Sequence, residues 1–103
     1  MDKYTIDISP EATEILISWV DKCEEDNGIN VANDLIDSYE AMLDTLEQDP
    51  EAGTGRLEDL PRKYRAYHIW RHLWAVYQIY YNVQTVKLEY IIDDRQDYKR
   101  FVK

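Results

Sequence analysis

The sequence predicts a single α+β domain in which two helices cover one face of a largely antiparallel sheet. The 103 residues are enough for one hydrophobic core and too few for two domains. The first half repeats apolar residues at helical spacing, and the second half is rich in Tyr, Trp, Val and Ile with stretches of alternation. The expected order is strand, helix, helix, three strands and a short final helix (β-α-α-β-β-β-α), in one domain over residues 1–103.

A half-buried strand is expected near the N-terminus, because Tyr4, Ile6 and Ile8 alternate with polar residues. The next two residues, Ser9 and Pro10, are typical of a helix N-cap and a first helical position. The helix that they begin has one apolar stripe for the core, formed by Ala12, Ile15, Leu16, Trp19, Val20 and Cys23. The single cysteine of the chain lies on this stripe, so we expect a buried small residue and not a reactive thiol.

A second helix is expected to follow directly, so that the two helices form a hairpin. Asn27 and Gly28 indicate the end of the first helix. Apolar residues then recur at helical spacing from Val31 to Leu46, and acidic residues fill the other positions, as is typical of a solvated face. The periodicity fails between residues 48 and 63, where Pro and Gly accumulate, which predicts a loop.

Three antiparallel strands are expected between Tyr64 and Ile92. The segment is rich in aromatic and β-branched residues, and it is broken near Arg71-His72 and again at residues 82–84. The clearest alternation is in the last of the three strands, from residue 85 to residue 92. Asp93 or Asp94 is expected to cap a short final helix over residues 95–102.

The charge of the chain is polarised. Residues 1–59 contain 17 acidic and 3 basic side chains, whereas residues 60–103 contain 4 acidic and 9 basic ones, and the net charge is −9. The overall charge disfavours a polyanionic partner, but the basic second half weakens that objection. No stretch approaches the roughly 20 apolar residues of a membrane span. The first residues do not have the pattern of a secretory signal, so we expect a cytoplasmic protein with no membrane partner.

Three segments of the sequence carry a resemblance to a known family. They are Tyr4–Ala12 (YTIDISPEA), Tyr64–Ile79 (YRAYHIWRHLWAVYQI) and Ile92–Tyr98 (IDDRQDY). In this order and spacing they resemble the RelE/ParE superfamily of bacterial toxins, over nearly the whole chain. The resemblance implies a RelE/ParE-like fold and a toxin of a type II toxin-antitoxin system, with the cognate antitoxin protein as its partner. RelE-like members cut messenger RNA on the ribosome without a metal or other cofactor, whereas ParE-like members inhibit DNA gyrase.

The same resemblance suggests candidate catalytic residues. By position, Arg65 and Arg95 match basic residues of the family, and Tyr98 matches its C-terminal tyrosine. Arg71 and His72 lie close by in the sequence, and a histidine titrates near neutral pH. In RNA cleavage of this kind a 2′-hydroxyl attacks the adjacent phosphate, while basic residues stabilise the charge of the transition state.

The leading hypothesis is a RelE-like, ribosome-dependent messenger RNA endonuclease. The three arginines would bind phosphate, and Tyr98 or His72 would transfer protons. A ParE-like gyrase inhibitor is the second hypothesis, favoured by the long helical hairpin and the Ser-Pro-Glu-Ala start. A third is an inactive relative that only binds antitoxin, because Trp74 stands where many members have an arginine and Tyr67 where RelE has a lysine.

Other chemistries are not indicated. His68 and His72 are four residues apart on a strand and turn, a spacing that does not predict a shared metal site. Gly53-Thr54-Gly55 follows no strand and is too short for a phosphate-binding loop. No cofactor or metal is therefore expected. Arg95→Ala is expected to relieve toxicity without unfolding the chain, because that charge lies outside the apolar faces.

Overall fold

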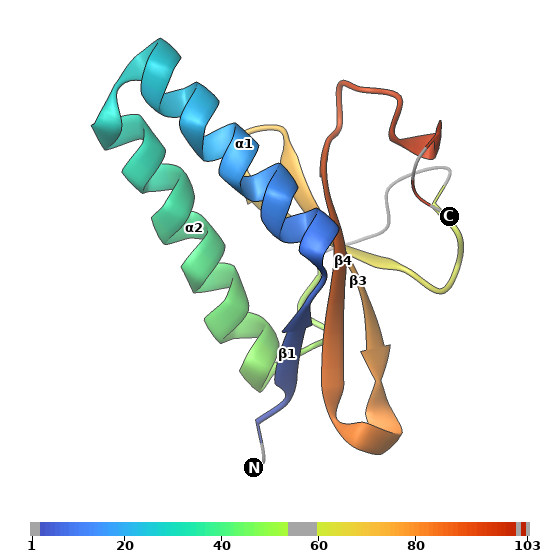
Figure 1. Cartoon of the computed structure of the whole chain (residues 1–103). Helices are drawn as coiled ribbons and strands as arrows, with labels where there is room; N and C mark the ends of the chain where they lie inside the picture. The colour runs from blue at the N-terminus through green and yellow to red at the C-terminus, as the bar shows by residue number, and fades with distance from the viewer. Residues whose placement is uncertain (1–2, 54–59, 101, 103) are drawn as a thin grey trace.

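The computed structural model describes residues 3–53, 60–100 and 102. Within them the chain forms an α+β fold in the expected order, so the predicted fold class is confirmed (Figure 1). The elements are β1 (Thr5–Ile8), α1 (Pro10–Asn27), α2 (Ile29–Gln48), β2 (Arg65–Trp70), β3 (Leu73–Tyr80) and β4 (Thr85–Asp93). Two short 3₁₀ turns follow β3 and β4, namely η1 (Tyr81–Val83) and η2 (Tyr98–Arg100).

The four strands form one mixed sheet in the order β1-β4-β3-β2. β2, β3 and β4 make the expected antiparallel meander. β1 lies at the edge and pairs in parallel with the first half of β4, with Ile6 opposite Val86. The N-terminal strand thus neighbours the last strand of the chain, a long-range pairing that alternation within each strand does not predict.

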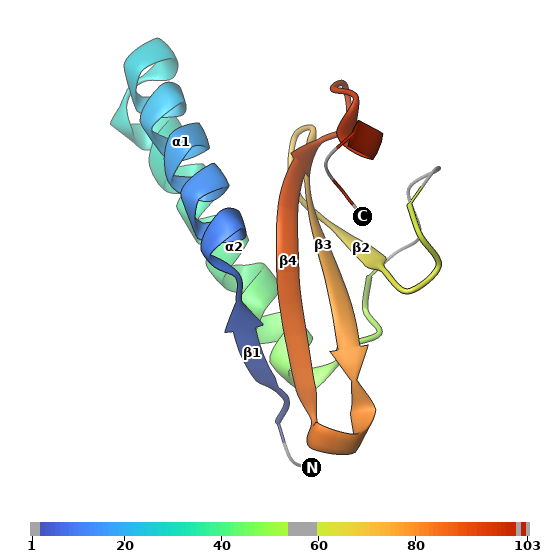
Figure 2. The ribbon, with the colours of Figure 1, turned by 45° about the vertical axis from the view of Figure 1, so that its right-hand side comes forward.

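The helical hairpin covers one face of the sheet (Figure 2). The Ser9 hydroxyl accepts a hydrogen bond from the Ala12 N–H over 3.0 Å, which confirms the predicted N-cap of α1. Gly28 ends α1 with a φ of +90°, a conformation that favours glycine. α1 packs over β4 and α2 over β2. Neither described helix combines the length and the apolar character of a bilayer span.

Apolar side chains bury both faces of the sheet. The larger core lies between the sheet and the helices, and its fully buried members include Leu35, Tyr77 and Leu88. Cys23 belongs to this core and is 7% exposed, as predicted from its stripe. A smaller core lies on the other face, beneath the segment before β2 and the C-terminal segment, and contains Leu60, Tyr64, Ala66, Val76, Ile92 and Val102.

The C-terminal segment departs from the expected helix. Residues 94–96 form a turn and a bend, and only the single 3₁₀ turn η2 follows among the described residues. The side chain of Asp93 accepts the backbone N–H of Arg95 over 2.8 Å, so Asp93 caps a turn and not a helix. The predicted loop before β2 is present on either side of residues 54–59, which lie outside the described residues together with part of the Gly53-Thr54-Gly55 pattern.

Candidate functional site

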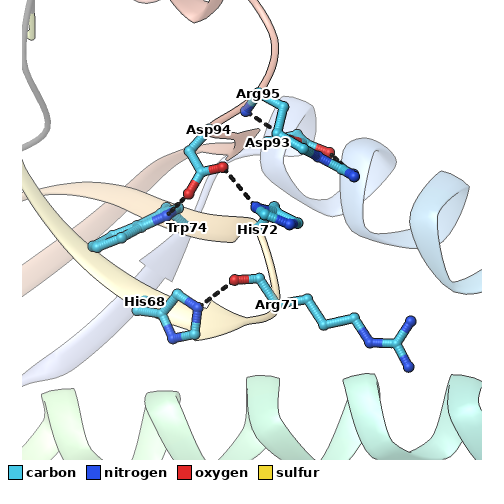
Figure 3. Close-up of polar contacts among 7 residues, drawn as sticks. All are labelled: His68, Arg71, His72, Trp74, Asp93, Asp94 and Arg95. Carbon is cyan, nitrogen blue, oxygen red and sulfur yellow. Dashed lines mark hydrogen bonds and ion pairs between the residues drawn. The ribbon is translucent and has the colours of Figure 1, made fainter.

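One corner of the sheet brings together three of the five predicted site residues (Figure 3). Arg71 and His72 form the turn between β2 and β3, and the antiparallel register makes β4 end beside it. The Asp94 N–H donates to the His72 carbonyl over 2.9 Å, which fixes the segment after β4 to the turn. Arg71, His72 and Arg95 consequently line the same cleft, although the arginines are far apart in the sequence.

The carboxylate of Asp94 joins His72 to Trp74. Its Oδ1 lies 3.0 Å from His72 Nδ1, and its Oδ2 accepts a hydrogen bond from Trp74 Nε1 over 2.9 Å. An ionised carboxylate only accepts hydrogen bonds, so His72 Nδ1 carries a proton. In the neutral ring Nε2 is then the nitrogen that accepts a proton. Because the pair is exposed, it orients the ring more than it stabilises the fold.

Asp93 and Arg95 form an ion pair with unequal exposure. The side chain of Asp93 is 2% exposed and that of Arg95 is 61% exposed. The guanidinium donates from Nη2 to Oδ2 over 2.8 Å and from Nε to Oδ1 over 3.1 Å. These hydrogen bonds lower the pKa of Asp93, the more so because the backbone N–H of Arg95 adds a third donor. Arg95 therefore neutralises a buried carboxylate.

The backbone at Arg71 is held in a sparsely populated conformation. Its φ is +50°, which residues with a side chain seldom adopt. Two-residue hairpin turns require positive φ because it matches the twist of the strands. A polar contact between His68 Nε2 and the Arg71 carbonyl stabilises the turn. Figure 3 shows the Arg71 guanidinium extending away from this contact. The guanidinium carbon lies 4.2 Å from the centre of the Trp70 ring.

A cleft of about 680 Å³ opens between this corner and the second half of α1. Its volume falls in the range of ligand-binding sites in proteins. Trp19, Lys22 and Asp26 contribute to the wall formed by α1, and Lys22 Nζ lies 5.4 Å from the centre of the Trp19 ring. The described residues contain no group of His, Cys, Asp and Glu side chains able to hold a metal ion. The cleft thus combines aromatic walls with cations.

The other two predicted site residues lie elsewhere. Arg65 begins β2, roughly 20 Å along that strand from Arg71. Its Nη2 donates to the Glu51 carbonyl over 3.0 Å, which ties the loop after α2 to the sheet. Tyr98 packs in the smaller core on the face of the sheet opposite the helices. The structure therefore divides the predicted catalytic set among three places.

Several residues of the cleft were not predicted from the sequence. Trp19 was assigned only to the apolar stripe of the first helix, and no functional role was assigned to Lys22 or Asp26. Asp93 and Asp94 were expected to cap a helix, not to pair with Arg95 and His72. The available signal was the Asp doublet at the end of the last strand, because an antiparallel meander brings that end beside the preceding hairpin turn.

Comparisons with known proteins agree with the fold. No protein-family model and no curated protein sequence matches the chain. Among solved structures, a chain from the chromosomal ParDE TA system of P. aeruginosa is similar with a TM-score of 0.72 and 16% identity, over 88% of this chain and 96% of that one. The YoeB dimer from Staphylococcus aureus gives a TM-score of 0.58 at 15% identity, over 85% and 93% of the two chains.

The intact E. coli RelBE toxin-antitoxin complex gives a TM-score of 0.55 at 15% identity, over 87% of this chain and 95% of that one. The three likenesses cover 85–88% of this chain and 93–96% of the other chains, so they concern the fold as a whole. The chain therefore shares its fold with these three structures, which agrees with the RelE/ParE-like fold expected from the three sequence segments.

Proposed function

We propose that this protein is the toxin of a toxin-antitoxin system and that a small antitoxin protein neutralises it. Two of the similar structures are described as a TA system and a toxin-antitoxin complex. The likeness extends over 88% and 87% of this chain, so it concerns most of the fold. The three sequence segments that resemble the superfamily lead to the same proposal independently.

Within that class, the protein acts by binding a protein target, DNA gyrase, in the manner of ParE-like toxins. The observation that carries this proposal is the dispersal of the predicted catalytic residues. Acid-base cleavage of RNA requires its proton-transfer groups and cations around one phosphate. Here Arg65 donates to a loop carbonyl and Arg95 is paired with Asp93. Tyr98 packs on the face of the sheet opposite the helices. A net charge of −9 further disfavours RNA.

A RelE-like ribonuclease is the second candidate, and one observation favours it. Asp94 orients the His72 ring so that Nε2 is available for proton transfer, and Arg71 lines the same cleft. His72 would have to serve as the proton-transfer group and Arg71 as the phosphate-binding cation. The other predicted residues, Arg65, Arg95 and Tyr98, would not take part. The ribosome and messenger RNA would then replace gyrase as the partners.

Inducing the chain alone in a bacterial host distinguishes these functions. We expect growth arrest with messenger RNA that stays intact during the first minutes. Purified protein should inhibit supercoiling by gyrase in proportion to its concentration, and His72→Gln should leave that inhibition unchanged. The measurements are the mapping of messenger RNA ends and a gel assay of plasmid supercoiling.

The opposite results identify the alternatives. New messenger RNA ends within translated frames, absent with His72→Gln, would replace gyrase inhibition by RNA cleavage. Overexpression without any growth defect would contradict both activities and leave a relative that only binds antitoxin.

A further inference from the structure

Two adjoining hollows, together called the groove, follow α1 on the side that faces the end of β4. The cleft beside the β2–β3 turn forms one part of it. A second hollow of about 550 Å³ lies nearer the start of α1 and is lined by Glu11, Glu14, Ile15 and Tyr90 among others. Both hollows are lined by Trp19 and Gln96, so they adjoin. Figure 2 shows that α1 diverges from β4 toward the C-terminal end of the helix.

The groove has opposite charges at its two ends. Glu11 and Glu14 lie at the end near the start of α1, and both are exposed. Lys22, Arg71 and His72 line the other end. Asp93 adds little negative charge there, because Arg95 neutralises it. Asp94 is occupied by its hydrogen bonds with His72 and Trp74, and Asp26 is the other acidic residue at this end. Lys22 and Arg71 are therefore the two cations that can meet an occupant.

The middle of the groove is apolar. Ile15, Trp19 and Tyr90 line it, and all three are half-buried. An occupant that matches the groove therefore has a cation at one end, an apolar side chain in the centre and an anion at the other end. Glu14 and Lys22 are eight residues apart on α1, which corresponds to about 12 Å at the rise of a helix. An extended peptide covers that distance in about four residues.

Nucleic acid fits this charge pattern poorly. A phosphate backbone along the groove would pass Glu11 and Glu14 and would meet Asp26 in the cleft. A single carboxylate side chain needs only the cationic end. Arg71 is suited to bind it, because its guanidinium lies over the Trp70 ring and a planar guanidinium matches a carboxylate with two parallel hydrogen bonds.

We propose that this groove binds an extended peptide segment of a partner protein. Glu11 and Glu14 bind a basic residue of that segment, and Trp19 packs against an apolar residue. Lys22 and Arg71 bind an acidic residue at the other end. The inference rests on the proposed function only in taking that partner to be the antitoxin. It defines the segment as Lys or Arg, then an apolar residue, then Asp or Glu, spread over about five residues. Recognition combines an apolar anchor with charge complementarity at both ends.

Fluorescein-labelled synthetic peptides test the proposal by anisotropy with the purified full chain. The probe contains Lys and Glu four residues apart with Val midway, and matched probes contain Gln and Gln, Lys and Lys, or Glu and Glu at those positions. We expect the Lys and Glu probe to bind at least about tenfold tighter than the Lys and Lys probe. Arg71→Glu should reverse that order, since the cationic end then favours a lysine.

Arg62→Glu is the control, because it makes the same charge change at an exposed position that does not line the groove. It should leave the order of the probes unchanged. Lys22→Glu provides a second test of the cationic end if circular dichroism shows that Arg71→Glu disturbs the fold.

The proposal is wrong if the four probes bind equally, or not at all, or if neither Arg71→Glu nor Lys22→Glu changes their order. Binding of a labelled RNA or DNA oligonucleotide that Arg71→Glu abolishes, with no peptide bound, would assign the cleft to nucleic acid. Peptide binding is measured without gyrase or growth. A negative gyrase assay therefore does not affect the conclusion on peptide binding, and a negative peptide assay does not affect the conclusion on gyrase.

Discussion

Replacing Asp93 with alanine is expected to lower the free energy of unfolding by about 2 kcal/mol, the range for hydrogen bonds to a charged group. The Asp93 carboxylate accepts three hydrogen bonds from Arg95, one of them from the backbone of the turn that follows β4. Its loss frees that turn and removes the partner of the guanidinium. Urea denaturation followed by circular dichroism at neutral pH measures the change.

Asp97→Ala is the matched control for this prediction. Asp97 also pairs with an arginine three residues later, but both side chains are exposed at 57% and 84%. Exposed pairs of this kind contribute little to stability. A loss of stability for Asp97→Ala as large as that for Asp93→Ala would contradict the structural role given to the buried carboxylate.

The contribution of Asp93 should also depend on pH. Its folded-state pKa is lowered from the ordinary value of 3.8, chiefly by the hydrogen bond from Arg95. The unfolded chain therefore binds a proton at a higher pH than the folded chain does. The stabilisation is complete above the unfolded-state pKa and is lost as the pH falls through the lower folded-state pKa. The difference in stability between wild type and Asp93→Ala should narrow below about pH 4, and a constant difference would contradict this.

This ion pair changes an expectation drawn from the sequence. Arg95 is exposed, as expected of a charge outside the apolar faces, but it neutralises a buried carboxylate. Arg95→Ala would leave Asp93 without its ionic partner, so lost toxicity in that variant would not by itself assign Arg95 to a functional site. Circular dichroism and a urea midpoint have to accompany any toxicity measurement on this residue. Sequence patterns do not reveal this because an Asp after a strand is typical of an exposed cap.

Local signals in the sequence predicted the elements well. The Ser9 cap, the glycine stop at Gly28 and the breaks at residues 71–72 and 82–84 depend on the chemistry of a few neighbouring residues, and each lies where the structure turns. The final helix was overestimated, because capping residues alone do not supply the apolar stripe that stabilises a helix. The parallel pairing of β1 with β4 joins residues about 80 positions apart, and local patterns contain no information on it.

The candidate site was predicted only in part for the same reason. Arg71 and His72 are neighbours in the sequence, so their proximity was certain. Arg95 joins them through the register of β3 and β4, which the meander implied. Lys22 comes from a helix whose position over β4 depends on the packing of the whole hairpin. The sequence therefore predicted the sheet side of the cleft and not the helix side.

Gly53→Ala is expected to lower the free energy of unfolding by about 1–3 kcal/mol, as is typical of overpacking in a well-packed region. A Cβ atom at Gly53 would lie 2.5 Å from the Tyr77 hydroxyl oxygen and 2.7 Å from the Ala66 carbonyl oxygen. The second of these atoms belongs to the backbone of β2 and is not free to move aside. The loop after α2 would have to shift, although the Tyr77 hydroxyl donates to the Pro50 carbonyl over 2.8 Å and Arg65 holds the Glu51 carbonyl.

A double-mutant cycle with Tyr77→Phe tests this close approach. Tyr77→Phe removes the hydroxyl that the new methyl group would meet, so Gly53→Ala should cost less in that background than in the wild type. Gly53→Ala should still lower the free energy of unfolding in that background, because the Ala66 carbonyl remains in place. Urea midpoints of the four proteins give the coupling energy. Strictly additive losses would contradict the contact with the Tyr77 hydroxyl and would leave the Ala66 carbonyl as the group that requires a glycine at this position.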